Sequence, residues 1–384
     1  MGEAGAIVGG HIDRNELRKG LYVPTREDKT LTDFFVDEYT EDGRLLIITG
    51  SAGDGKSALL SRAFKQAQGK SHSLDESDIC MDATASDSKH ETYDAALKRF
   101  LDRAEERRAS RLGSRSGIAI NLGLAIDFFD RQGHDEEFPE IWAGIDQVRT
   151  EREYIDPETN IKVLNLGHRK LYETAPGYLG EGLLEDIVEK FAFEDPESPF
   201  HNAFRRELDR CPNPKECPLH FNAAQFAKPA VRKQVTRLIA ASGIIENAYL
   251  NPRSILDKIS SMILPSSLQR VDDTGNCPVG AAASSKKFSP EVLLWNSVFN
   301  TLSSNDEESA GHIDPAAHSS VSLDQELLGW GADRDRLGEL LGETPLMENA
   351  DVATSIRTTL RRVYLLDEPV VNGSIQTPLE TDTF

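Results

Sequence analysis

The chain has 384 residues, of which 39% are hydrophobic and 28% are charged, a composition typical of globular proteins. This length exceeds what one hydrophobic core usually fills, so we expect two or three cooperative units. No stretch approaches the roughly 18 apolar residues of a membrane span, and the N-terminus lacks a basic region followed by an apolar run. We therefore expect a cytoplasmic protein without membrane attachment. Four cysteines are too few for a disulfide framework in a chain of this length.

The formal net charge of −21 arises from 43 basic and 64 acidic side chains. This acidity excludes unspecific attraction of the whole surface to nucleic acid or to an anionic membrane, so any DNA contact has to be local. It is equally typical of a salt-adapted proteome. Local clusters of arginine either bind phosphate or, as the simpler alternative, form solvated helix faces paired with acids. The three clusters are Arg107, Arg108, Arg111 and Arg115; Arg205, Arg206 and Arg210; and Arg357, Arg361 and Arg362.

Strand and helix patterns alternate over the first 180 residues. Continuous short apolar runs predict buried strands, and apolar residues at helical spacing predict helices over 59–67 and 91–109. Strands that alternate with helices indicate an α/β fold, with a mostly parallel sheet flanked by helices on both faces. The predicted strands are 45–49, 79–81, 117–122 and 161–166.

Helical spacing dominates from about residue 181 onward, which predicts an all-helical lid and a further helical C-terminal region. Two stretches rich in small and polar residues, near 265–290 and 303–323, predict linkers or mobile insertions. The chain ends soon after an apolar segment at 363–366, so we expect the last region to be incomplete. The predicted division is an N-terminal segment (1–40), an α/β core (41–180), a helical lid (181–265), a linker (266–290) and a C-terminal helical region (291–384).

A glycine-rich sequence follows the first predicted strand directly. Residues 50–57, Gly-Ser-Ala-Gly-Asp-Gly-Lys-Ser, match the P-loop pattern, and their place between a strand and an amphipathic helix is the context that this motif requires. Glycines allow successive amide N–H groups to cradle phosphates, and Lys56 supplies positive charge to the β- and γ-phosphates. The hydroxyl of Ser57 is expected to ligate Mg²⁺. The core is thus predicted to be a P-loop NTPase that binds ATP and Mg²⁺ through Gly50, Ser51, Ala52, Gly53, Asp54, Gly55, Lys56, Ser57 and Ala58.

Hydrolysis needs a second carboxylate to hold Mg²⁺ or to orient water. Asp82, after the strand predicted at 79–81, is the first candidate and Asp127 the second, although either is equally readable as a strand-end or N-cap residue. Asn121 and Asn165 are expected to end strands at the edge of the sheet that carries the loop, where ligands of parallel sheets bind. Asn121 then either positions the attacking water or tolerates a tight turn, and for Asn165 we favour the turn.

Arg253 follows Pro252 in the first turn of a predicted helix of the second unit. A cation on such a helical lid is able to reach across a nucleotide cleft and stabilise developing phosphate charge, which would make Arg253 a catalytic residue beside Lys56, Asp82 and Asn121. The alternative is a surface arginine with a solvated guanidinium.

Cys211, Cys217 and His220 lie within ten residues of the sequence, and Cys277 is available as a fourth ligand. Such a set suits tetrahedral Zn²⁺. The gap of five residues between the first two cysteines is longer than that of most zinc motifs, so two free or buried thiols are the alternative.

Five segments resemble the DptF family, the ATP-binding proteins of phosphorothioation-dependent DNA restriction systems. The resemblance spans about residues 10–265 and is carried by 21–25, 53–57, 119–123, 217–222 and 251–253. It implies an AAA-like ATPase in which Asn121 is the sensor asparagine at a strand end and Arg253 the lid arginine. It also implies work with sister restriction proteins in antiviral defence, contact with DNA through that complex, and possible homo-oligomers.

These observations favour an ATP-binding and ATP-hydrolysing subunit of a DNA restriction complex, in which nucleotide state moves the helical lid. The alternative is a nucleotide-dependent signalling switch that binds ATP with little turnover and acts through protein partners only. A small-molecule kinase is less favoured, because no phosphate-acceptor site or arginine-rich lid closely follows the loop.

Overall fold

The computed structural model describes residues 20–36, 43–68, 76–83, 92–110, 115–175, 178–180, 182–198, 200–202, 205, 209, 211, 213–265, 288–303, 313–317, 341, 344–348 and 350–366. Internal contacts divide the chain into two compact units. The first unit extends to Lys170 and includes Asn251–Arg253, whereas the second comprises Leu171–Leu250 and continues from Ser254.

A five-stranded sheet with the strand order β2-β3-β1-β5-β4 forms the centre of the first unit. β1 pairs in parallel with β3 and β5, β2 pairs in parallel with β3, and β4 runs antiparallel to β5 at one edge. The carboxyl ends of the four parallel strands therefore meet at the same edge of the sheet. The strands are β1 (Arg44–Thr49), β2 (Ile79–Cys80), β3 (Arg115–Ala119), β4 (Glu153–Asp156) and β5 (Ile161–Asn165).

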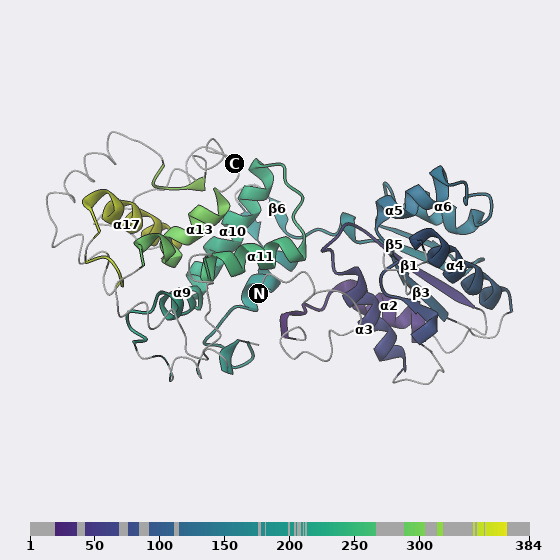
Figure 1. Ribbon diagram of the computed structural model, residues 1–384, viewed down its shortest axis with the longest axis horizontal. Coiled ribbons are helices and arrows are strands. Elements are labelled where there is room, and N and C mark those ends of the chain that lie inside the picture. The colour runs from purple at the N-terminus through teal and green to yellow at the C-terminus, as the bar shows by residue number, and fades with distance from the viewer. Residues whose placement is uncertain are drawn as a thin grey trace. The chain divides into compact units, whose positions relative to one another are not determined.

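Helices cover both faces of this sheet (Figure 1). Leu46 and Ile48 of β1 belong to a core cluster with residues of α2 and α3, whereas Leu45 and Ile47 belong to a second cluster with residues of α4 and α6. This alternation explains why the whole of β1 is buried. The elements are α2 (Arg26–Val36), α3 (Lys56–Gln68), η3 (Glu76–Asp78), α4 (Tyr93–Ala109), α5 (Leu122–Ile126), η4 (Asp127–Arg131), α6 (Pro139–Gln147) and η5 (Leu166–His168).

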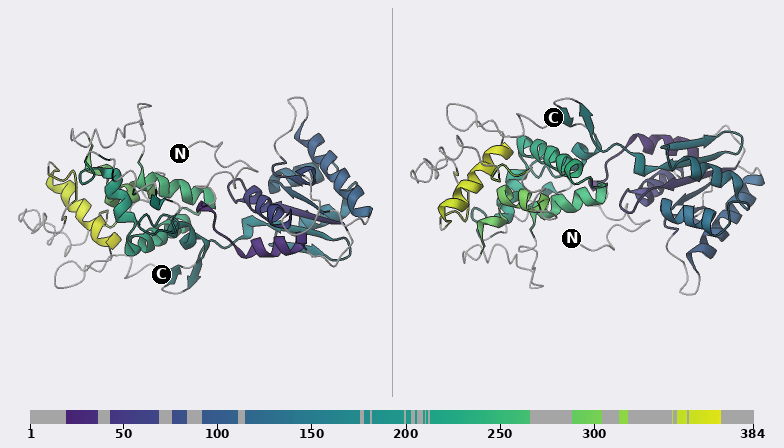
Figure 2. Two further views of the ribbon diagram at one scale, coloured as in Figure 1. Left: turned by 90° about the horizontal axis from the view of Figure 1, so that it is seen from below. Right: turned by 90° about the horizontal axis from the view of Figure 1, so that it is seen from above.

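The second unit is mostly helical. Among its described helices, α10 is the longest and is largely buried, and α13 buries Trp295 and Phe299. Figure 2 shows these helices and the yellow α17 from two further sides. The elements are β6 (Glu173–Ala175), β7 (Tyr178–Gly180), α7 (Leu183–Glu189), α9 (Pro218–Phe226), α10 (Pro229–Ile245), α11 (Pro252–Ile263), η7 (Pro290–Val292), α13 (Leu294–Leu302) and α17 (Val352–Leu366).

Buried polar side chains connect these helices. The Asn222 amide donates to the carbonyl oxygens of Ile263 and Val292 at 3.0 and 2.9 Å, and it accepts from the N–H of Leu294 at 2.6 Å. Arg361 of α17 donates to both carboxylate oxygens of Asp314 at 3.1 and 2.6 Å. Satisfied buried groups of this kind fix a single arrangement of the helices.

The predicted α/β class with a mostly parallel sheet is confirmed, and the four predicted strands are present with slightly shifted ends. The sequence did not reveal β4 or the hairpin of β6 and β7. Because the hairpin belongs to the second unit, that unit is not entirely helical. The linker predicted at 266–290 lies almost wholly outside the described residues. Among the helices that are described, none is long and apolar enough to cross a membrane.

Candidate functional site

The glycine-rich loop, Gly50–Gly55, connects the buried end of β1 to the first residue of α3. Gly50 and Gly53 have φ values of 142° and 93°, a region that side chains rarely tolerate. A Cβ atom on Gly50 would lie 2.5 Å from Oδ2 of Asp54, and one on Gly53 would lie 2.8 Å from Oδ1 of Asn251. Both positions therefore require glycine, for backbone conformation and for space.

Side chains of the loop hold it in shape from inside. Asp54 is only 3% exposed, and its Oδ2 accepts from the backbone N–H of Ser51 at 2.5 Å. The Nζ of Lys56 donates to the carbonyl oxygens of Gly50 at 3.2 Å and Ser51 at 2.7 Å. The ammonium group thus lies back over the loop, beside the first turn of α3.

The charge environment of Lys56 identifies its neighbours. Burial lowers the pKa of Lys56 below its ordinary range, the carboxylates of Asp54 and Asp82 act in the opposite direction, and the guanidinium of Arg253 lowers that pKa further. Two acids and a second cation therefore lie within electrostatic reach of this ammonium group.

The ends of β2 and β3 bring the predicted catalytic residues to the same place. The hydroxyl of Ser57, in the first turn of α3, donates to the carbonyl oxygen of Met81 at 2.6 Å. The half-buried Asp82 is the next residue after Met81, so it lies close to the start of α3. The N–H of Leu122 donates to the carbonyl oxygen of Gly50 at 3.2 Å, which places Asn121 beside the loop. Asn121 caps α5, since its Oδ1 accepts from the N–H of Gly123 at 2.9 Å.

The structure does not bring Asp127 to the site as a strand-end acid. Residues 124–126 form part of α5 rather than a strand, because Asn121 caps a helix at this point. The Asp127 carboxylate accepts from Tyr93, Arg131 and Gln132 at 3.2–3.3 Å. The reading of Asp127 as a strand-end carboxylate is therefore wrong.

Asn165 occupies the turn favoured for it from the sequence. Its side chain is 3% exposed, donates to the carbonyl oxygen of Val148 at 2.8 Å and accepts from the N–H of Gly167 at 2.9 Å. Both ends of the amide are used to hold the turn after β5, so Asn165 has a structural role.

Arg253 lies at the loop as part of the first unit. Asn251–Arg253 group with that unit, and the amide of Asn251 donates to the carbonyl oxygen of Ala52 at 3.2 Å. Within the described part of the chain, the Nε of Arg253 is buried and has no hydrogen-bond partner. Arg253 lies in the first turn of a helix, as expected, and groups with the first unit, whereas the rest of this helix from Ser254 groups with the second.

Two residues have contacts at the loop that the sequence did not predict. Asn251 contacts Ala52 from about 200 residues away in the chain, and no local pattern announces such a contact. Asp54 was assigned to nucleotide binding as a member of the motif, whereas its carboxylate turns inward and braces the backbone.

The arginine clusters mostly follow the simpler alternative. Arg107 pairs with Asp78, Arg108 with Glu105 and Glu140, and Arg361 with Asp314. Arg357 lies 3.5 Å from Glu291. Arg111, Arg206 and Arg210 fall outside the described residues. These described arginines therefore form ion pairs with acidic side chains of the same protein.

The predicted zinc ligands Cys211, Cys217 and His220 lie together in the second unit, with their ligand atoms within 4.8 Å of one another. Cys277 falls outside the described residues.

Comparisons of the chain with family models, with curated proteins and with solved structures gave no match in any of the three. Backbone N–H groups at the start of a 13-residue helix, together with the cations Lys56 and Arg253, form an environment that suits a multiply charged anion.

Proposed function

We propose that the glycine-rich loop binds ATP with Mg²⁺ and that the first unit is the core of a P-loop ATPase. The observation that carries this proposal is that Lys56 and Arg253 both lie at a loop of positive-φ glycines, at the carboxyl edge of a parallel sheet: Lys56 donates to the carbonyl oxygen of Ser51, and a Cβ atom on Gly53 would lie 3.0 Å from that of Arg253. Two cations that repel one another at a helix N-terminus are stabilised by a phosphate chain between them.

In this proposal, each residue at the loop has a separate role in ATP binding or hydrolysis. Lys56 exchanges its hydrogen bonds to the carbonyl oxygens of Gly50 and Ser51 for phosphate oxygens, and Arg253 contacts the terminal phosphate. Ser57 and Asp82 are the residues that would hold Mg²⁺, and the ion would supply positive charge to the phosphate oxygens. Asn121, whose Oδ1 caps α5 in this structure, would orient the attacking water.

We further propose that the ATPase is a subunit of a phosphorothioation-dependent DNA restriction complex with sister restriction proteins as partners. Two other segments that carry this resemblance, 119–123 and 251–253, lie beside the loop segment 53–57 although they are far apart in the sequence. The rival proposal is a signalling switch that binds ATP, turns it over slowly and engages proteins only.

The experiment is steady-state ATP hydrolysis and equilibrium ATP binding by the full chain with Mg²⁺, at low and high salt, with and without DNA. Lys56→Ala and Arg253→Ala remove the two cations. Arg131→Ala is the matched control, since it removes an arginine of the same unit that is 77% exposed and pairs with Asp127.

We expect Lys56→Ala to weaken ATP binding at least tenfold and Arg253→Ala to reduce turnover more than binding, whereas Arg131→Ala changes neither. ATP binding that survives Lys56→Ala unchanged contradicts the nucleotide site. Stimulation by DNA that disappears in Lys56→Ala supports the restriction ATPase. Tight binding without turnover under every condition favours the switch.

A further inference from the structure

The start of α9 brings together three side chains that bind soft metals. Cys217 is the N-cap residue of α9, and His220 lies in its first turn. Cys211 comes from the loop that precedes the helix. The two sulfur atoms and a ring nitrogen of His220 all lie within 4.8 Å of one another.

This spacing suits a tetrahedral metal centre. Zinc binds thiolates at about 2.3 Å and imidazole at about 2.0 Å, so neighbouring ligands in a tetrahedron lie roughly 3.5–3.8 Å apart. Side chains that already meet within 4.8 Å need only small rotations to reach that separation. Two thiolates and an imidazole select zinc over magnesium or calcium, which prefer oxygen ligands.

The surroundings of the three ligands are those of a closed structural site. Cys217 is fully buried, His220 is 7% exposed and Cys211 is half-buried. Cys217 packs with Val292 in an apolar cluster that also contacts Cys211 and Leu219. Burial of this kind keeps solvent from displacing a metal, and it is typical of zinc that stabilises a fold rather than of zinc that turns over substrate.

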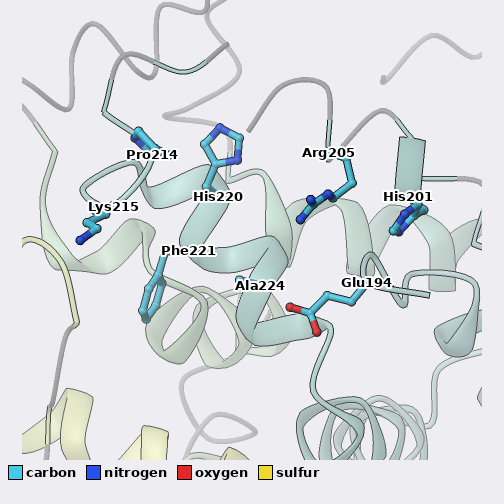
Figure 3. Close-up of a pocket in the computed structure, with 8 residues that line it drawn as sticks. All are labelled: Glu194, His201, Arg205, Pro214, Lys215, His220, Phe221 and Ala224. Carbon is cyan, nitrogen blue, oxygen red and sulfur yellow. The ribbon is translucent and has the colours of Figure 1, made fainter. Parts of the chain in front are cut away.

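We propose that Cys211, Cys217 and His220 bind a structural zinc ion, which pins the loop 211–217 to the first turn of α9. This loop and helix form one side of a pocket of about 540 Å³, to which they contribute Pro214, Lys215, His220 and Phe221 (Figure 3). The metal thereby fixes the wall of that pocket. Three ligands come from the described part of the chain, and a structural site of this kind takes its fourth ligand from the protein as well.

The first measurement is the zinc content of the full chain, purified without chelator under reducing conditions. We expect one zinc ion per chain, and loss of most of it in Cys211→Ser and in His220→Gln. Cys80→Ser is the matched control, because Cys80 is a half-buried thiol on β2 of the first unit, outside this cluster. It should retain all of the zinc.

A second measurement uses the unmodified protein, so it does not require any variant to fold. Alkylation of the native protein, mapped by mass spectrometry, should modify Cys211 and Cys217 at least tenfold faster after a zinc chelator is added, while the rate at Cys80 stays unchanged. Cobalt added to the chelated protein should give the absorption of a tetrahedral thiolate complex.

Several results would overturn the proposal: protein without zinc that also fails to bind cobalt, zinc that persists fully in both variants, or a disulfide between Cys211 and Cys217 in the reduced preparation. Alkylation rates that the chelator leaves unchanged would overturn it as well. None of these outcomes depends on whether the glycine-rich loop binds ATP.

Discussion

The geometry of the glycine-rich loop predicts how strongly a single methyl group at Gly50 destabilises the first unit. In Gly50→Ala the backbone keeps a φ of 142° that alanine resists, at about 1–3 kcal/mol. The new Cβ lies 2.5 Å from Oδ2 of Asp54, so this carboxylate has to leave the N–H of Ser51. A charge-assisted hydrogen bond of that kind contributes about 1.5–3 kcal/mol. Together these effects predict a loss of about 4 kcal/mol.

Two other glycines serve as controls that separate the cost of a positive φ from the cost of the Cβ contact with Asp54. Gly55 and Gly133 also have positive φ, at 88° and 77°, but a Cβ atom on either meets nothing within 4 Å. Gly55→Ala and Gly133→Ala should therefore lose only about 1–2 kcal/mol each, the ordinary cost of a left-handed alanine. Gly55 belongs to the loop and Gly133 does not.

Amide exchange in peptides from β1 and α3, followed by mass spectrometry at increasing urea, reports the stability of the first unit without interference from the second. We expect Gly50→Ala to unfold these peptides at a clearly lower urea concentration than the two controls. If Gly50→Ala loses no more stability than Gly55→Ala, the carboxylate of Asp54 does not brace the loop and the reasoning fails.

Three further predictions concern charges. Because Arg253 lowers the pKa of Lys56, Arg253→Met should raise that pKa toward the ordinary value of about 10.5, measured by NMR of methylated lysines, and a fall would contradict the proximity of the two cations. Since folded Lys56 holds its proton less tightly than the unfolded chain does, stability should rise with pH between the lowered pKa and about 10.5. In the second unit, Arg361 is only 6% exposed, and Asp314→Ala removes the carboxylate that pairs with its guanidinium. This variant should lower the free energy of unfolding, measured in urea, by about 3–5 kcal/mol. The double variant Asp314→Leu with Arg361→Met should lose less, and a loss under about 1 kcal/mol in Asp314→Ala alone would show that the pair is not buried in solution.

The features of the fold and the site that were predicted from the sequence are those with a local sequence pattern. β1 is an unbroken apolar run because both of its faces are buried, and the glycine-rich loop with Lys56 and Ser57 directly follows it. Asn121 was expected at the edge of the sheet that carries the loop, because parallel strands bring their carboxyl ends to one edge, and it lies beside the loop. Each of these inferences needed only a window of about ten residues and one rule of sheet geometry.

The features that it missed depend on long-range packing. β4 reads Glu-Tyr-Ile-Asp, with exposed and half-buried residues in alternation, and as a short edge strand it buries too little to produce an apolar run. Asp127 was misread because Leu124–Ile126 are apolar in a short helix, which periodicity cannot distinguish from a strand over so few residues. The contact between Asn251 and Ala52 leaves no local trace.

α11 shows the same limit of local patterns. Its apolar residues Ile255 and Ile259 recur at helical spacing and are fully buried, so periodicity was enough to predict the helix. The helix begins with Pro252 and Arg253, which group with the first unit, and continues from Ser254 with residues that group with the second. Such a division depends on contacts between residues far apart in the chain, so a local window cannot show it.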